Sequence, residues 1–112
     1  MKQFVVIGLG RFGSSVASTL CNLGYEVLGI DTDEEIVASL AGSITHVVEG
    51  DATDENTLKT LGVRNFDVGI VSIGNDIQAS ILATLNLKEI GIKYVVAKAL
   101  SKTHGKVLHK IG

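Results

Sequence analysis

Short apolar segments alternate with helix-like segments along the whole chain. The apolar segments are rich in Val and Ile and are mostly continuous. This pattern is typical of strands that are buried on both faces of a parallel sheet, because a strand with one solvent-exposed face alternates apolar and polar residues. The pattern therefore predicts five buried strands, at residues 4–7, 27–30, 46–48, 68–73 and 94–97.

Between these strands, apolar residues recur at helical spacing, and a glycine that can end a helix often follows. Thr32 and Glu35 form the sequence pattern of a capping box, so the second helix is expected to begin at Thr32. Thr53 is expected to cap the third helix. The predicted helices begin near Ser14, at Thr32, after Glu55, near Asp76 and near Ser101, and four of them end at Gly24, Gly62, Gly91 and Gly112.

Five strand–helix units with short connections indicate an α/β fold, a Rossmann-like doubly wound parallel sheet with helices on both faces. Right-handed crossovers favour the strand order 3-2-1-4-5, with a switch point between strands 1 and 4. In such sheets ligands bind at the switch point, outside the carboxyl ends of the strands. The loops that follow the strands are therefore the candidate site.

The first of these loops contains the pattern G-x-G-x-x-G, at Gly8, Gly10 and Gly13. Between a strand and a helix, these glycines permit a tight turn, a close approach of backbone to a pyrophosphate, and close packing of helix on strand. Arg11 lies inside the turn, where it either pairs with phosphate oxygens or faces solvent. Phe12 is expected to pack under the turn rather than stack on a base.

Asp31 ends the second strand, at the spacing of about 20 residues expected for a carboxylate that binds ribose hydroxyls. The same carboxylate repels a 2′-phosphate, and no basic residue lies between Thr32 and Glu35, so NADP is disfavoured. Asp31 does not distinguish NAD from ATP or ADP, because all of them carry this ribose. The alternative is a glycine-rich turn beside a solvated aspartate.

Three further loops complete the candidate site. We expect the loop after the third strand near the adenine, although Asp51 also fits the start of a helix. Lys98, after the fifth strand, either reaches a phosphate or remains on the surface. The candidate residues of these loops are Asp51, Ala52 and Thr53, then Ser72, Ile73 and Gly74, and finally Lys98.

Composition narrows the function. The 112 residues are enough for one domain, and 46% hydrophobic with 20% charged residues is ordinary for a folded protein. A net charge of -2 provides no basic field to attract nucleic acid. No apolar run approaches the roughly 20 residues of a membrane helix, so we expect a cytoplasmic chain.

The chain contains no recognisable catalytic or metal-binding set, and we do not expect an enzyme. Cys21 lies on the apolar stripe of the first helix, where a buried, inert thiol is expected. His46, His104 and His109 form no metal-binding pattern with it. From the residues alone, the chain is a nucleotide-binding module without visible chemistry.

Four segments carry a resemblance to a known family: IGLGRFGSSVASTL, GIDTDEEIV, the stretch from VVEGDATDEN to SIGNDIQAS, and VVAKAL with HGKVLHKIG. Together they resemble the N-terminal nucleotide-binding lobe (residues 1–112 here) of the KTN or RCK (TrkA-N) regulatory domains of Trk and Ktr potassium transport systems, most closely the KtrA type. The sequence departs from the family pattern at Leu100, where a polar residue is expected.

The resemblance implies a regulatory subunit that binds ATP, ADP or NAD(H) and gates a potassium transporter or channel. It also implies dimers that assemble into a ring on the cytoplasmic face of an integral membrane subunit. The family's C-terminal lobe has no counterpart in these residues. The main alternative is the cofactor-binding fragment of an NAD-dependent oxidoreductase, and a third is a redox-sensing repressor subunit.

Overall fold

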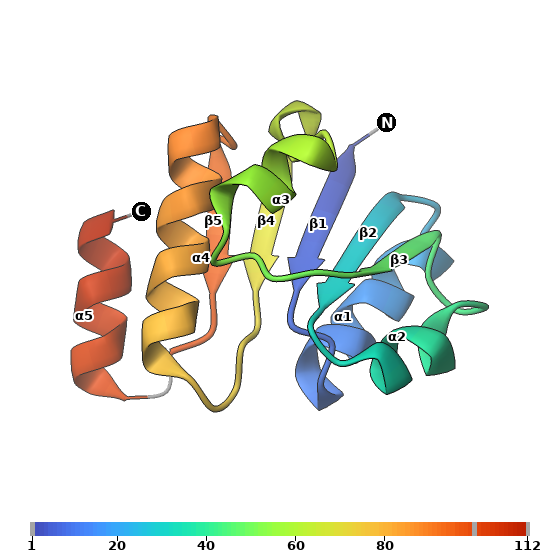
Figure 1. Ribbon diagram of the computed structural model, residues 1–112, viewed down its shortest axis with the longest axis horizontal. Coiled ribbons are helices and arrows are strands. Elements are labelled where there is room, and N and C mark those ends of the chain that lie inside the picture. Colours follow the sequence, from blue (N-terminus) through green and yellow to red (C-terminus); the bar gives the residue numbers. More distant parts are fainter. Residues whose placement is uncertain (1, 100, 112) are drawn as a thin grey trace.

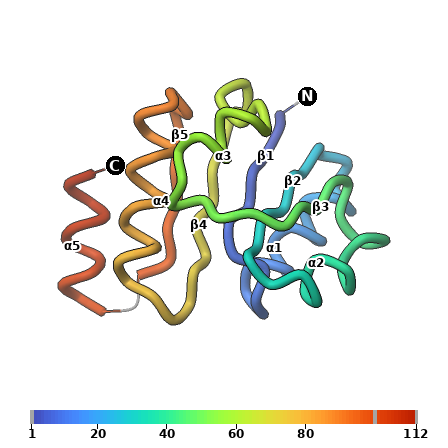
Figure 2. The backbone as a smooth tube through the Cα atoms, viewed as in Figure 1, coloured from blue at the N-terminus to red at the C-terminus, as the bar shows by residue number. Residues whose placement is uncertain are grey.

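Five parallel strands form one sheet in the order β3-β2-β1-β4-β5, as the sequence predicts (Figure 1). The computed structural model describes residues 2–99 and 101–111. The strands are β1 (Gln3–Ile7), β2 (Glu26–Asp31), β3 (His46–Glu49), β4 (Val68–Val71) and β5 (Tyr94–Ala97). The connection from β3 to β4 crosses from one half of the sheet to the other (Figure 2). The switch point therefore lies between β1 and β4.

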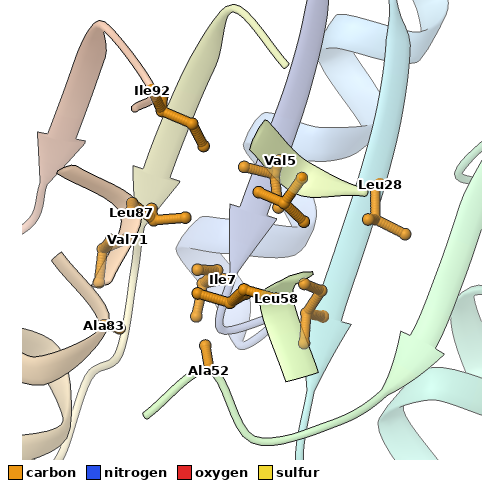
Figure 3. Close-up of a cluster of buried hydrophobic side chains, with 11 residues drawn as sticks. Val5, Ile7, Leu28, Ala52, Leu58, Val71, Ala83, Leu87 and Ile92 are labelled. Atoms are coloured by element: carbon orange, nitrogen blue, oxygen red, sulfur yellow. The ribbon is translucent and has the colours of Figure 1, made fainter. Parts of the chain in front are cut away.

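Helices cover both faces of the sheet. The helical elements are α1 (Arg11–Asn22), α2 (Glu34–Leu40), α3 (Glu55–Thr60), the short 3-10 helix η1 (Val63–Asn65), α4 (Ile77–Ile90) and α5 (Lys102–Ile111). Val6 of β1 packs in a cluster with Ala17 of α1, whereas Val5 packs on the other face with Leu58 of α3 and Leu87 of α4 (Figure 3). The last helix, α5, packs against α4.

Two of the predicted helix caps are wrong. The carboxylate of Asp33 accepts a hydrogen bond from the amide of Glu35 and caps α2, so Thr32 does not form the expected capping box. Asp54 caps α3 in the same way. The hydroxyl of Thr53 instead donates to Asp51 at 2.6 Å. In both cases the aspartate one position further along the chain provides the capping oxygen. The predicted start of the fourth helix near Asp76 is confirmed, and the Asp76 side chain caps it.

The other element boundaries follow the sequence more closely. The first helix begins at Arg11 rather than near Ser14, because Gly10 already has the extended backbone of an N-cap. The fourth strand ends at Val71, where its pairing with β5 stops, rather than at residue 73. Glycines with positive φ follow α1, α3 and α4, as predicted, at Gly24, Gly62 and Gly91. The expectations for Leu100 and Gly112 lie outside the described residues.

The edge strand β5 departs from the prediction of strands buried on both faces. Tyr94 and Val96 are each 59% exposed. The side chains of Val95 and Ala97, on the other face, pack against the core. The reason is that α1 and α2 cover β1, β2 and β3, and no described helix covers β5 on that side. Cys21 is half-buried, and the amide of Thr45 contacts its sulfur at 3.4 Å.

Within the part of the chain that the structure describes, none of the helices combines the length and the apolar composition that crossing a membrane requires.

Candidate nucleotide-binding site

A crevice of about 670 Å³ opens at the carboxyl ends of the strands, at the predicted switch point. Thirteen of the fourteen candidate residues line it, and Gly13 does not. The lining candidates are Gly8, Gly10, Arg11, Phe12, Asp31, Thr32, Asp51, Ala52, Thr53, Ser72, Ile73, Gly74 and Lys98. Sequence reasoning therefore located the crevice, and the geometry below separates the roles of its residues.

The three glycines of the first loop meet different constraints. Gly8 has φ of +90°, and a Cβ there would lie 2.5 Å from the carbonyl oxygen of Ser72. A Cβ on Gly13 would lie 1.8 Å from the carbonyl oxygen of Gly8, so Gly13 is required for packing of α1 on the end of β1. A Cβ on Gly10 would have no atom within 4 Å. Of these three glycines, only Gly10 therefore faces open space in the crevice.

The N-terminus of α1 has no side-chain cap. Its N-cap residue is Gly10, whereas aspartate side chains cap α2, α3 and α4. The first backbone N–H groups of a helix lack partners within the helix and, together with the helix dipole, favour an anion. Among the described residues the one ion pair joins Lys59 to Glu55, so the guanidinium of Arg11 beside this terminus has no carboxylate partner there.

Asp31 is a structural residue as well as a candidate ligand. One carboxylate oxygen accepts a hydrogen bond from the amide of Leu9 at 2.7 Å, and the other accepts from the amide of Asp33 at 2.8 Å. The alternative of a merely solvated aspartate is therefore wrong. An ionised carboxylate has about four acceptor sites, so each oxygen keeps capacity for a further donor such as a ribose hydroxyl.

Among the titratable groups of the described residues, Asp51 is the one whose pKa clearly departs from its ordinary value. The hydroxyl of Thr53 and, to a smaller extent, its backbone N–H donate to the carboxylate and hold the pKa of Asp51 below 3.8, against a smaller opposing effect of burial. Asp51 therefore stays ionised across the physiological range. Its negative charge lies on the same side of the crevice as Asp31.

Sequence reasoning missed Asn86 of α4. It is 8% exposed and does not line the crevice, but its side-chain amide donates to the carbonyl oxygens of Ala52 and Thr53, both at 3.0 Å. The available signal was an amide within the apolar helical run ILATLNL. A polar residue on the buried face of a helix requires a partner.

Phe12 does not pack under the glycine turn, as expected, but is 48% exposed at the crevice. The ammonium group of Lys98 lies 5.3 Å from the centre of its ring, which is within the range of a cation–π contact. The ring is exposed because it lies in the first turn of α1, where the sheet face beside β5 is uncovered. Lys98 and Arg11 are the two basic residues among those that line the crevice.

The described residues contain no group of three His, Cys, Asp or Glu side chains that could hold a metal ion.

Comparisons with known proteins agree with the fold. The TrkA-N domain model matches residues 4–112. The Ktr system potassium uptake protein C of Bacillus subtilis is 54% identical over 111 residues, which are 99% of this chain and 50% of that protein. The Ktr system potassium uptake protein A of the same organism is 53% identical, with the same coverage.

Among solved structures, GsuK bound to ADP superposes with a TM-score of 0.81 at 29% sequence identity, covering 99% of this chain and 28% of that chain. The fold and the crevice define a Rossmann-like domain with its candidate site at the switch point. The chain belongs to the TrkA-N domain family, which confirms the resemblance to the regulatory domains of Trk and Ktr systems. It spans about half the length of the Bacillus relatives.

We expect the substitution Asp31→Asn to lower the free energy of unfolding by about 1–3 kcal/mol in the absence of ligand. Asparagine keeps one acceptor oxygen, so the amide of Leu9 or Asp33 faces an NH₂ group. Denaturant unfolding measures the change. Asp33→Asn is the matched control, because asparagine caps a helix as well as aspartate does. Equal stability of the two variants contradicts the structural role of Asp31.

Replacing Thr53 with valine removes the hydroxyl that donates to Asp51, so the pKa of Asp51 is expected to rise toward 3.8. A lowered pKa in the folded state contributes stability above the unfolded pKa, and that stability is lost as the pH falls through the folded value. Thr53→Val should therefore weaken the loss of stability on acidification below about pH 4. An NMR titration of the carboxyl group measures the pKa, and an unchanged value rules out this cause.

Proposed function

We propose that this chain is the N-terminal nucleotide-binding lobe of a regulatory subunit that controls potassium transport, and that it binds ATP, ADP or NAD(H). The observation that carries this proposal is that one crevice brings together two kinds of group. The uncapped N-terminus of α1, Arg11 and Lys98 can bind phosphates, and the carboxylates of Asp31 and Asp51 can accept hydrogen bonds. A nucleotide needs both, because it carries phosphates and ribose hydroxyls.

Each part of the ligand then has a partner. The phosphates approach Gly10, where no Cβ is in the way, and bind the backbone N–H groups of α1 with Arg11 and Lys98. The ribose hydroxyls donate to Asp31, and the adenine lies toward Asp51. NADP is disfavoured, because its 2′-phosphate meets the carboxylates of Asp31 and Asp33. The structure of GsuK bound to ADP supports an adenine nucleotide as the ligand.

The relatives support a regulatory rather than an enzymatic role, since the Bacillus proteins are potassium uptake proteins. We propose that the subunit lies in the cytoplasm and contacts an integral membrane subunit that conducts potassium. Ligands that differ in affinity for two shapes of the assembly shift the balance between those shapes. An additional phosphate near Arg11 distinguishes ATP from ADP and provides such a difference.

An exposed apolar surface supports assembly with a second copy of the chain. The surface is formed by Ile77, Leu82 and Leu85 of α4, with Val107 of the adjacent α5, each between 36% and 43% exposed. Exposed apolar side chains on two helices that pack together are a typical feature of protein interfaces. We propose that two copies pack through this surface and that such dimers form the ring.

The ligand proposal is tested with two glycine variants of opposite character. Gly10→Ala should lower the free energy of unfolding by no more than about 1 kcal/mol, because no atom crowds the added Cβ and the cost is that of a poorer N-cap. It should weaken ATP, ADP and NADH binding more than about tenfold, since the Cβ occupies the space of the pyrophosphate. Calorimetric titration with ATP, ADP, NADH and NADPH measures the affinities.

Gly13→Ala provides the contrast, because its Cβ meets the backbone of Gly8 and should destabilise the fold before any ligand is added. Absence of binding by the unmodified chain to all four ligands contradicts the proposed function. Unchanged affinity in Gly10→Ala contradicts the placement of the phosphates at this glycine. Binding of NADPH as tight as that of NADH contradicts the role of Asp31.

The assembly proposal predicts that Leu85→Lys converts a dimer into a monomer, because a charged ammonium group cannot be buried unpaired in an apolar interface. Analytical ultracentrifugation measures the mass. Leu23→Lys is the matched control, since Leu23 is 68% exposed at the end of α1, away from this surface. A dimer that persists in Leu85→Lys, or that is lost equally in the control, contradicts the interface.

A further inference from the structure

Asn86 joins the middle of α4 to a loop that lies 33 and 34 residues earlier in the sequence. Its side-chain nitrogen donates to the carbonyl oxygens of Ala52 and Thr53, at 3.0 Å each. Both protons of the amide group are therefore used on two consecutive peptide units of one loop. This loop connects β3 to α3 and lines the crevice.

The side chain of Asn86 is buried, so water cannot replace its hydrogen bonds. Asn86 is 8% exposed, and its neighbours Ala83 and Leu87 on α4 belong to the hydrophobic core. A buried amide is destabilising unless it is hydrogen-bonded, and carbonyl groups left without a donor are also destabilising. The side-chain amide of α4 and the carbonyl groups of the loop therefore satisfy each other's hydrogen-bonding capacity. The position of the loop depends on a donor at residue 86.

The loop is fixed from its other side as well. The carboxylate of Asp51 accepts from both the amide and the hydroxyl of Thr53, at 2.9 Å and 2.6 Å. Between them, the side chain of Ala52 is 4% exposed and points into the core toward Ile7 (Figure 3). Asn86 is thus the one contact that ties this loop to α4 by its backbone oxygens among the hydrogen bonds of the described residues.

We propose that Asn86 is a positioning residue that gives the site its selectivity for adenine over guanine. The inference rests on the proposed function, in which the adenine lies beside the Asp51–Thr53 loop. Polar groups distinguish two bases only when they are fixed relative to the base edge, because discrimination depends on donors and acceptors that are left unpaired by the wrong base. The phosphates bind the separate β1–α1 turn, which Asn86 does not contact.

The experiment compares the affinities of ATP and GTP for the unmodified chain and for Asn86→Leu, by calorimetry. Leucine has a similar volume and no donor. We expect the affinity for ATP to fall about tenfold, which is the effect of losing one or two hydrogen bonds. The affinity for GTP should change less than about twofold. The ratio of the two affinities is the readout, because general destabilisation lowers both affinities together.

Thr84→Val is the matched control. Thr84 is 2% exposed on the same helix, and its hydroxyl bonds only to the carbonyl of Ser80 within the helix. The control should keep the ATP to GTP ratio of the unmodified chain. If Thr84→Val lowers the ratio of ATP affinity to GTP affinity as much as Asn86→Leu does, the effect belongs to α4 as a whole. That result overturns the role of Asn86.

Asn86→Asp replaces Asn86→Leu if the leucine variant does not fold, because an ionised carboxylate of the same shape has no proton to donate. Asn86→Asp should lower the ratio of ATP affinity to GTP affinity as Asn86→Leu does. An unchanged ratio in the folded variant overturns the inference and leaves the proposed function intact. Equal affinity of the unmodified chain for ATP and GTP also overturns the inference alone, whereas no nucleotide binding at all overturns both.

Discussion

The close approach of Gly13 to Gly8 is the contact on which the site depends. No other residue fits at position 13, because a Cβ there would lie 1.8 Å from a backbone oxygen that belongs to the end of β1. Backbone cannot move aside as a flexible side chain can. The contact sets α1 directly against the end of β1, so the free N–H groups of α1 face the switch point. The proposed phosphate position therefore depends on backbone packing as well as on the charges of Arg11 and Lys98.

Asp31 extends this arrangement to the neighbouring strand. Through the amides of Leu9 and Asp33, its two carboxylate oxygens connect the glycine turn to the start of α2. The same carboxylate faces the crevice, so the residue that orders the loop is also the candidate partner of the ribose. A ligand then meets a carboxylate that is already oriented, and little side-chain entropy is lost on binding.

The strands, their order and most of the crevice followed from the sequence, because apolar runs and glycine positions report directly on a parallel sheet. The helix caps could not be predicted, because two neighbouring side chains are each able to cap the same helix. Thr32 and Asp33, or Thr53 and Asp54, compete for the same cap, and the sequence does not tell which one reaches the helix. In the structure Asp54 caps α3, and the hydroxyl of Thr53 donates to Asp51 instead.

Contacts between residues far apart in the sequence could not be predicted either. The exposure of Phe12 depends on which sheet face lacks a helix, and the contact of Asn86 with Ala52 joins elements separated by α3, η1 and β4. An amide within an apolar helix indicates that a partner exists but not where it lies.

The placement of α4 has a mechanical consequence. The helix is 14 residues long, about 21 Å at 1.5 Å per residue, and behaves as a stiff rod. Its first turn, at Asp76 and Ala79, lines the crevice beside the end of β4, and about two turns further along it contacts the β3–α3 loop through Asn86. Ile77, Leu82 and Leu85 of the same helix are exposed. Because one stiff helix contacts the crevice at both places, a shift of its axis would displace both of them together.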